Sequence, residues 1–405
     1  MKAAPSPDEI RRRNLAVLLR HVHVSGPLSR AELAERMGLN RSTILALTTD
    51  LAAAGLVREE LPGQTGKAGR PSLVVRPESD RVYVLALDVG ADRLAVARVG
   101  LGGAILDRCE MPRDTGTFDP DEVIAELARM TESMMDAAHK GAVCVGVGLA
   151  FCGMVRERDG VVRYGPNIGW VDVPVGALLS ERLGVPVAVG NNANLGAIAE
   201  RERGVGTGVR DLIYLHGEVG IGGGVIMGGE LLGGEGGYGG EVGHMIVNPG
   251  GRACRCGSRG CLEAEAGELA LIAAAGRSDL TGRAAVAAIV DAAARGDADA
   301  RDALHQVGDW LGYGVANLVN VFNPTMVVFG GVLREIYLAA AAQVRSRLAV
   351  NGLLAVRERV RLRTSALADD APLVGAAELA FAELLTDPLQ TLARAQTPDL
   401  RASTE

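Results

Sequence analysis

Residues 220–226 read Gly-Ile-Gly-Gly-Gly-Val-Ile, residues 239–245 read Gly-Gly-Glu-Val-Gly-His-Met, and residues 254–263 read Cys-Arg-Cys-Gly-Ser-Arg-Gly-Cys-Leu-Glu. Glycine at this density allows tight turns and close approach of the backbone to a neighbouring group. The histidine and the three cysteines are residue types that bind transition metals. These runs therefore predict glycine turns beside a metal-binding loop.

The metal ligands predicted from this stretch are one imidazole and three thiolates. They follow the spacing His-x9-Cys-x-Cys-x4-Cys, and Gly257 and Gly260 permit the tight loop. A Cys3His set suits a closed, tetrahedral structural zinc, and a reducing cytoplasm favours a metal over a disulfide. We predict one zinc per chain, and the alternative is a loop with reactive or unpaired thiols. The predicted ligands are His244, Cys254, Cys256 and Cys261.

The segments around this stretch alternate between strand-like and helix-like patterns. Short apolar runs that predict strands occur at 81–88, 93–99, 143–149, 185–190, 212–215, 223–227 and 326–329. A helical pattern over 120–139 lies between two of them. Strands interleaved with helices at this spacing predict an α/β body with two layered halves.

The N-terminal segment has a different organisation. Helices are predicted over residues 8–24, 30–37 and 41–54. Ser29 with Glu32 three residues later forms a capping box for the second helix, and Asn40 caps the third. A glycine-rich tip at 63–71 and a strand at 72–76 complete the order of a winged helix-turn-helix.

This head is predicted to bind DNA. The N-terminal end of its third helix would lie in the major groove, and the wing tip would place a guanidinium in the minor groove. The alternative is a three-helix unit that only mediates protein contacts. The predicted DNA contacts are Arg41, Ser42, Thr43, Thr48, Lys67 and Arg70.

Charge supports the DNA-binding interpretation. Residues 1–76 carry 12 Lys+Arg against 7 Asp+Glu, whereas the rest of the chain carries 30 against 42. A basic head on an acidic body is expected to meet a polyanion through the head.

Composition narrows the class of protein. The chain has 405 residues, of which 48% are hydrophobic and 22% charged, which excludes an intrinsically disordered chain. It lacks an apolar run long enough for a transmembrane helix, and its start does not resemble a secretory signal. We therefore expect a cytoplasmic protein without a membrane partner.

The body, residues 80–385, resembles the ROK family of bacterial repressors and sugar kinases. The three runs quoted above carry this resemblance, and further matching runs follow the same order along the chain. These are 166–170 (Pro-Asn-Ile-Gly-Trp), 191–194 (Asn-Asn-Ala-Asn), 323–324 (Asn-Pro), 330–331 (Gly-Gly) and 375–377 (Gly-Ala-Ala). The resemblance implies the two-lobed actin-like ATPase fold, and a winged head before such a body is similar to the repressor branch.

The resemblance also implies a sugar site. Carboxylates, amides and a histidine at the matching positions would hydrogen-bond sugar hydroxyls, with the histidine contacting metal and sugar through different ring nitrogens. Each of these residues could instead be a buried polar group satisfied by the backbone. The implied sugar-binding residues are Asn167, Asn191, Asn192, Glu241, His244 and Glu263.

Two departures from the kinase pattern argue against catalysis. The family's general base is an aspartate at the position of Asn192, and an amide has no useful basicity at neutral pH. The first phosphate loop reads Asp-Val-Gly-Ala-Asp-Arg over 88–93, which places Asp92 where a hydroxyl would meet phosphates. We predict no enzymatic activity. The alternatives are an active sugar kinase and a sugar-sensing adaptor that does not bind DNA.

The sequence thus predicts a sugar-responsive regulator, a homodimer or tetramer that binds a roughly palindromic operator and is released by a sugar or sugar derivative. Four parts are expected. They are a winged helix-turn-helix at 1–76, a first lobe at 80–190 completed by a helix near 372–387, a second lobe at 191–371 with the zinc loop and a dimerisation surface, and a flexible tail at 388–405.

Overall fold

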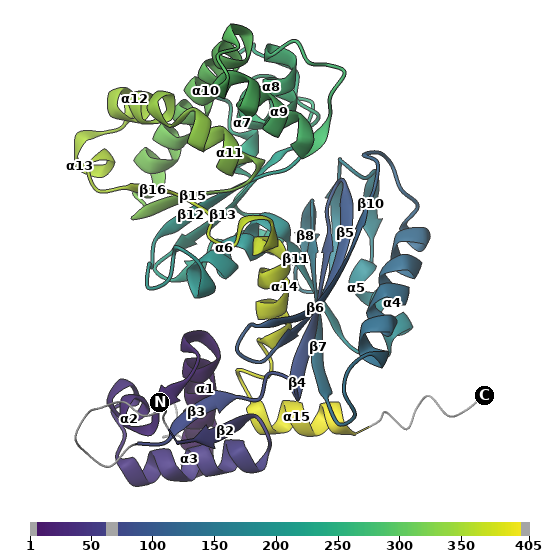
Figure 1. The fold of residues 1–405 in the computed structure, drawn as a ribbon, viewed down its shortest axis with the longest axis vertical. Coiled ribbons are helices and arrows are strands. Elements are labelled where there is room, and N and C mark those ends of the chain that lie inside the picture. The colour runs from purple at the N-terminus through teal and green to yellow at the C-terminus, as the bar shows by residue number, and fades with distance from the viewer. Residues whose placement is uncertain (1–5, 62–71, 398–405) are drawn as a thin grey trace.

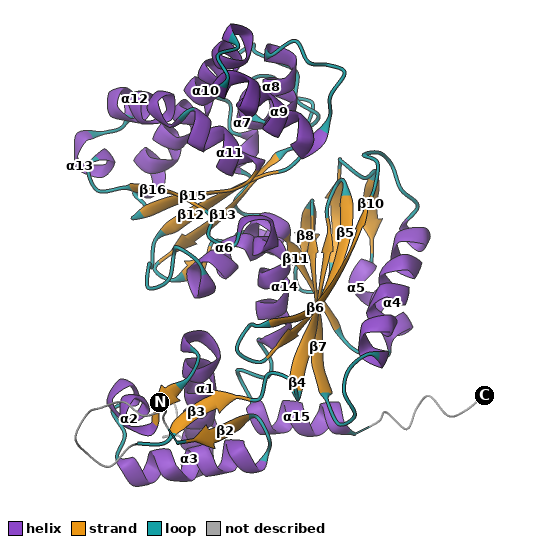
Figure 2. Cartoon of the chain, in the orientation of Figure 1, coloured by secondary structure: helices purple, strands orange, loops and turns teal. Residues whose placement is uncertain are grey.

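The computed structural model describes residues 6–61 and 72–397. Three units follow one another along the chain, and Figure 1 shows them as a small head, a first lobe beside it and a second lobe above. Figure 2 shows that each lobe combines a central sheet with covering helices, whereas the head is mostly helical. This is the predicted α/β class with a winged head.

The head has the predicted order of elements. Ser29 and Glu32 form both hydrogen bonds of the expected capping box, and Asn40 accepts from the N–H of Thr43. Gly38, at φ 63°, makes the left-handed turn between the second and third helices. A three-stranded sheet in the order β1-β3-β2 forms the wing. The elements are α1 (Pro7–Ser25), β1 (Leu28–Ser29), α2 (Arg30–Met37), α3 (Arg41–Ala53), β2 (Val57–Glu60) and β3 (Val74–Pro77).

The first lobe is built on a five-stranded sheet in the order β11-β7-β4-β5-β6. The central strand β4 is buried along its whole length and pairs parallel with β7 and antiparallel with β5. Helices α4 and α5 cover one face of this sheet. The elements are β4 (Val82–Val89), β5 (Arg93–Gly100), β6 (Ile105–Pro112), α4 (Pro120–Asp136), β7 (Val143–Phe151), β8 (Met154–Arg156), β9 (Val161–Gly165), β10 (Trp170–Val173), α5 (Val175–Leu183) and β11 (Val187–Asn191).

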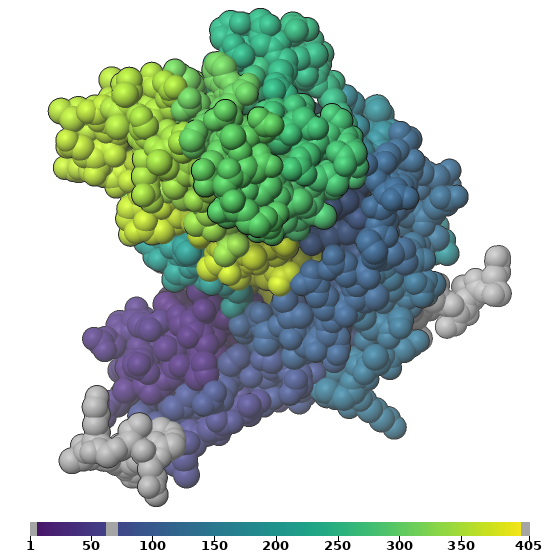
Figure 3. All heavy atoms as spheres, turned by 45° about the horizontal axis from the view of Figure 1, so that its top comes forward, coloured from purple at the N-terminus to yellow at the C-terminus, as the bar shows by residue number. Residues whose placement is uncertain are grey.

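The second lobe has its own five-stranded sheet in the order β14-β13-β12-β15-β16, with most of its helices gathered on one face. In Figure 3 the green and yellow-green second lobe and the blue first lobe meet along a seam. The elements are β12 (Leu212–Gly217), β13 (Ile221–Met227), β14 (Glu230–Leu231), α7 (Leu262–Ala266), α8 (Glu268–Ala274), α9 (Gly282–Ala294), α10 (Ala298–Phe322), β15 (Met326–Gly331), α11 (Val332–Ala339), α12 (Ala341–Asn351), α13 (Leu354–Arg357) and β16 (Arg361–Thr364).

Two helices in contact join the lobes: α6 (Asn192–Arg203) and α14 (Ala371–Phe381). Glycines allow this close packing. A Cβ on Gly224 of β13 would lie 2.5 Å from the Cβ of Ala197 in α6, and one on Gly148 of β7 would lie 2.0 Å from the carbonyl oxygen of Ala376 in α14. Thus α6 is fitted to the sheet of the second lobe and α14 to the sheet of the first.

The predicted flexible tail at 388–405 is wrong for residues 388–396, which form helix α15 (Pro388–Gln396). Leu392 and Thr391 are buried, and Leu392 joins the apolar core shared by the head and the first lobe. The apolar side chains lie on one face of the helix, and their burial offsets the entropy cost of ordering it. Residues 398–405 lie outside the described part of the chain.

None of the described helices is both long and apolar enough to cross a membrane.

Candidate functional site

A cavity between the two lobes brings all six predicted sugar-binding residues together. The first lobe contributes residues from β8, the β9–β10 loop and the end of β11, and the second contributes the β12–β13 turn and the cysteine loop. The cavity measures about 90 Å³, well below the roughly 300 Å³ of the smaller drug-sized sites. A ligand the size of a sugar would therefore enter only when the lobes part or a lining side chain moves. The predicted residues that line it are Asn167, Asn191, Asn192, Glu241, His244 and Glu263.

The side chains of the two asparagines at the end of β11 hydrogen-bond to backbone groups. Asn191 caps α6 by accepting from the N–H groups of Ala193 and Asn194, and its Nδ2 donates to the carbonyl of Gly153 at 2.9 Å. The buried Asn192 accepts from Ala193 N–H at 2.9 Å. Both side chains are thus held rigidly at the N-terminus of a helix, and Asn192, as an amide, has no useful basicity.

The two carboxylates differ in what holds them. Glu263 accepts from the N–H of Ile221 at 3.1 Å, which ties the cysteine loop to the glycine turn. Glu241 has a pKa above its usual range because burial, and secondarily the charge of Glu263, disfavour ionisation, against the attraction of His244. Its Oε2 lies 3.9 Å from Nε2 of His244. Glu241 and Glu263 both line the cavity and offer oxygen acceptors to it.

Arg255, between two of the cysteines, was not among the predicted site residues. Its Nη1 donates to Oδ1 of Asn167 at 2.6 Å, and both residues line the cavity. This bond joins the second lobe to the first and occupies an acceptor predicted to face the ligand. The only sequence signal was the position of Arg255 inside the cysteine loop.

The predicted metal ligands converge. The ligand atoms of His244 and the three cysteines all lie within 4.8 Å of one another, so the set could hold a metal ion. Sγ of Cys254 lies 3.7 Å from Nδ1 of His244, and Sγ of Cys256 lies 3.7 Å from Sγ of Cys261. Metal–sulfur bonds of about 2.3 Å at tetrahedral angles place two sulfurs about 3.8 Å apart, so the spacing fits a tetrahedral ion. Nδ1 of His244 faces the sulfur of Cys254, and Nε2 of the same ring faces Glu241.

The cysteine loop depends on Gly260. This residue has φ +74°, and a Cβ on it would lie 1.7 Å from the carbonyl oxygen of Asn248. Only glycine fits such a turn, which brings Cys261 back toward Cys256.

The region of the first phosphate loop is filled by an internal ion pair. Asp88 is buried, and Nη2 of Arg93 lies 3.1 Å from its Oδ2. The same guanidinium donates to the carbonyl of Asp369 in the second lobe at 3.0 Å. Burial raises the pKa of Asp88, and Arg93 opposes that rise. The sequence predicts the departure at Asp92 but not this pairing.

Glu218, in the turn between β12 and β13, is the second residue that sequence reasoning missed. Its Oε1 accepts from the N–H of Ala91 at 3.2 Å. Burial and the nearby charges of Asp88 and Asp92 raise its pKa to about 8. A carboxyl group therefore occupies a backbone N–H that the first phosphate loop would offer to an anion.

In the head, Arg41 and Ser42 are exposed at the start of α3, and Thr43 is half-buried. Their neighbour Asn40 accepts from both hydroxyls. The prediction for Thr48 is wrong. It is fully buried on the face of α3 that packs into the head, and its hydroxyl donates to the carbonyl of Leu45 at 3.1 Å. Lys67 and Arg70 lie outside the described residues.

Comparison with known proteins places the body in a family. The ROK family pattern matches residues 84–383. The chain belongs to the ROK family. Among its relatives, the xylose repressor of Bacillus subtilis is 28% identical, and the match covers 93% of this chain and 97% of the repressor. The putative xylose repressor of Caldicellulosiruptor sp. is also 28% identical, over 94% of this chain and 98% of the relative.

The solved structures that this chain resembles include both a ROK regulator and a ROK kinase. A ROK family transcriptional regulator, described as a homolog of the E. coli MLC protein, superposes with a TM-score of 0.77 at 25% identity and covers 95% of this chain and 99% of its own. A ROK family glucokinase from Streptomyces griseus, solved with glucose and AMPPNP, has a TM-score of 0.64 at 29% identity and covers 74% of this chain and 99% of its own. The ROK regulator therefore matches nearly the whole chain, whereas the ROK kinase matches part of it.

Proposed function

We propose that this ROK protein is a sugar-responsive transcriptional repressor without kinase activity. The observation that carries the proposal is coverage: repressor relatives align over the head as well as the body, whereas the glucokinase of Halalkalibacterium halodurans aligns over only 73% of the chain. The head supplies a helix-turn-helix with an exposed N-terminal end on α3. A winged helix-turn-helix binds DNA and contributes nothing to phosphate transfer.

The body would bind the effector in the cavity between the lobes. Glu241, Glu263 and His244 would accept from or donate to hydroxyl groups, and Asn192 would hold the ligand without activating it. Parting and closing of the lobes would change the position of the two heads in a dimer. Affinity for a roughly palindromic operator would then fall by the ratio of the ligand's affinities for the two states.

Zinc is the metal we propose for the cysteine cluster. Three thiolates and one imidazole form a donor set that favours Zn²⁺, and four protein ligands leave no open position for catalysis. When bound, the metal would supply a fixed tautomer for His244. The chain's own contribution is to hold Nε2 of this histidine toward Glu241 and the cavity.

The DNA contacts we propose are Arg41, Ser42 and Thr43 on α3, with Lys67 and Arg70 from the wing tip. The α3 residues would read or position the major groove, and the wing would add phosphate or minor-groove contacts.

The test has three measurements on the intact protein. A duplex is selected from random DNA, binding of hexoses, pentoses and amino sugars is measured by calorimetry, and a coupled assay with Mg-ATP measures phosphorylation. We expect a selected duplex, a sugar that weakens its binding, and no turnover above background. Turnover of any sugar, or failure to enrich a duplex, contradicts the proposal.

A further inference from the structure

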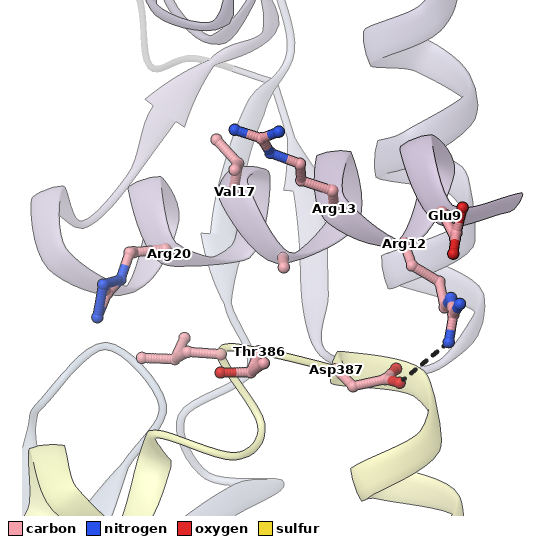
Figure 4. Close-up of a pocket in the computed structure, with 9 residues that line it drawn as sticks. Glu9, Arg12, Arg13, Val17, Arg20, Thr386 and Asp387 are labelled. Atoms are coloured by element: carbon pink, nitrogen blue, oxygen red, sulfur yellow. Dashed lines mark ion pairs between the residues drawn. The ribbon is translucent and has the colours of Figure 1, made fainter. Parts of the chain in front are cut away.

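The contact between the head and the body differs along helix α1, with an open groove beside one part and close packing at the C-terminal end. Beside residues 9–20 of this helix lies an open groove of about 530 Å³. Figure 4 shows Arg12 pointing across it toward Asp387, with a separation of 4.0 Å between Nη1 and Oδ2. An exposed ion pair at this distance contributes little to stability. The groove is lined by Glu9, Arg12, Arg13, Ala16, Val17 and Arg20 of α1 and by Leu385, Thr386 and Asp387.

The other end of α1 is held firmly. His23 is fully buried, and its ring packs edge-on against Phe381 with the ring centroids 4.8 Å apart. Its Nδ1 accepts from the N–H of Gly102 at 3.0 Å, and its Nε2 lies 3.1 Å from Oε2 of Glu378. The same Nε2 lies 2.6 Å from Nη2 of Arg203. The helix is thus fixed near residue 23 and loosely apposed near residue 12.

Arg203 completes this buried cluster from a different part of the chain. Its Nε donates to the carboxylate of Glu378, and its Nη1 donates to the carbonyls of Gly102, at 2.8 Å, and of His23, at 3.3 Å. A Cβ on Gly103 would lie 2.2 Å from the carbon of the guanidinium, so the glycine turn leaves room for it. Burial alone would raise the pKa of Glu378, but hydrogen bonds and charges from His23 and Arg203 outweigh it and lower the pKa to about 2.

Arg203 connects this cluster to the ligand cavity. It is the last residue of α6, whose N-cap is Asn191 in the cavity wall. Twelve helical residues span about 18 Å, so one rigid rod joins the two places. The helix is fitted to the sheet of the second lobe, whereas His23, Gly102 and Glu378 belong to the head and the first lobe. Within residues 6–61 and 72–397, Arg203 makes the only side-chain hydrogen bonds between the second lobe and the head.

We propose that Arg203 is the positioning residue through which the second lobe sets the tilt of α1 and hence of the DNA-binding head. Movement of α6 over α14 carries the guanidinium away from acceptors that stay with the first lobe. Helix α1 then turns about His23, and the groove beside Arg12 takes up the change. The inference rests on the proposed repressor function, because it explains how occupancy of the cavity reaches the head.

The test compares Arg203→Gln with the matched control Arg201→Gln. Arg201 lies in the same last turn of α6, but its guanidinium binds Glu202 and the carbonyl of Gly229 and so stays within the second lobe. For each protein, affinity for the selected duplex is measured with and without the sugar found by calorimetry, and affinity for the sugar with and without the duplex. The coupling is the ratio of the duplex affinities without and with sugar, and equally the ratio of the sugar affinities without and with duplex. Coupling is reciprocal, so a variant must change both ratios together.

We expect the parent and Arg201→Gln to show equal coupling, in the roughly 5- to 150-fold range of allosteric proteins. In Arg203→Gln the ratio should fall below about threefold while the sugar affinity without DNA changes by less than about twofold. A merely structural role would lower stability or both affinities without removing the ratio. Full coupling in Arg203→Gln overturns the proposal. If this variant does not fold, as judged by thermal unfolding, Arg203→Lys is used, because a single ammonium cannot reach all of the acceptors.

A second measurement separates this inference from the proposed function. Hydrogen exchange of the apo proteins needs neither sugar nor DNA. We expect amides in the C-terminal half of α1 to exchange several-fold faster in Arg203→Gln than in Arg201→Gln. Equal exchange rules out the positioning role. If exchange differs but no sugar or duplex binds the parent, the repressor function fails and the contact between α6 and the head stands.

Discussion

The carboxyl group of Glu218 accepts a hydrogen bond from the backbone N–H of Ala91 at 3.2 Å, although the two residues belong to different lobes. A Cβ on the adjacent Gly90 would lie 2.4 Å from the same Oε1, so the glycine allows this approach. The contact places an acidic group of the second lobe against the loop that would have to receive phosphate. It would therefore be a third obstacle to kinase chemistry, beside the two departures predicted at Asn192 and Asp92.

The first prediction concerns restored phosphate transfer. Asn192→Asp alone should give at most a trace of sugar phosphorylation, because the charge of Asp92 still opposes the phosphates and Glu218 still occupies the N–H of Ala91. A positioned base is worth about 10²–10⁴-fold in rate, and that gain needs bound ATP to be visible. The triple variant Asn192→Asp, Asp92→Thr, Glu218→Thr should exceed the single one in a coupled assay. If the single variant equals the triple one, neither Asp92 nor Glu218 obstructs nucleotide binding.

The second prediction concerns the pH dependence of stability. Folding raises the pKa of Glu218 from 4.5 to about 8, so between these values the folded chain holds a proton that the unfolded chain releases. The stabilisation is complete below pH 4.5 and is lost as the pH rises through 8. Glu218→Gln keeps the acceptor for Ala91 and removes the titration. Relative to the parent, its free energy of unfolding should rise with pH by up to about 1.4 kcal/mol per unit.

Urea unfolding of both proteins at pH 5, 6, 7 and 8 measures this difference. The pKa of Glu378, at about 2, lies outside the window, so that residue contributes no slope there. Parallel curves for the parent and Glu218→Gln would show that Glu218 titrates normally.

Local rules explain why much of the head and of the metal loop could be predicted. The caps at Ser29 and Asn40 involve partners three residues away, and His244 and the cysteines lie close in the sequence. The wing tip with Lys67 and Arg70 stays a prediction, because it lies outside the described residues.

Contacts between distant segments could not be predicted in this way. The partner of Glu218 is 127 residues away, that of Arg255 is 88, and His23 meets Glu378 across 355. The burial of Thr48, in contrast, could have been predicted from the sequence. Thr48 falls four residues after Ile44 and next to Leu47, on the buried side of α3, so the apolar periodicity should have outweighed its polarity.

The third prediction concerns the metal. Protein purified without added zinc should contain close to one equivalent, and Cys256→Ser should lose most of it. Loss of a residue that only hydrogen-bonds to a metal ligand lowers metal affinity roughly 10–100-fold. Loss of a ligand itself should lower it more. Cys109→Ser is the matched control, since this exposed cysteine lies on β6, away from the cluster. A fully loaded Cys256→Ser variant would contradict the ligand assignment.

The fourth prediction concerns DNA binding. Arg41→Ala and Arg70→Ala should each weaken binding of the selected duplex and leave sugar binding unchanged. Loss of a phosphate contact should reduce the salt slope by about one, whereas loss of a base contact costs about 1–3 kcal/mol and relaxes specificity. Arg129→Ala, on the exposed face of α4, is the control. If both head variants bind like the parent across a salt titration, the contacts lie elsewhere.

The last prediction concerns the effector. Glu241→Ala should abolish sugar binding and with it the release of DNA, while the affinity of the apo protein for the duplex stays within about twofold of the parent. The reason is chemical: the carboxylate beside Nε2 of His244 lines the cavity as a hydrogen-bond acceptor, and alanine removes that acceptor. Glu235→Ala, at an exposed position before the same loop, is the control. Calorimetry and a DNA-release titration run on the same preparations decide the matter, because a variant that no longer binds sugar yet still releases DNA when sugar is added would place the effector outside this cavity.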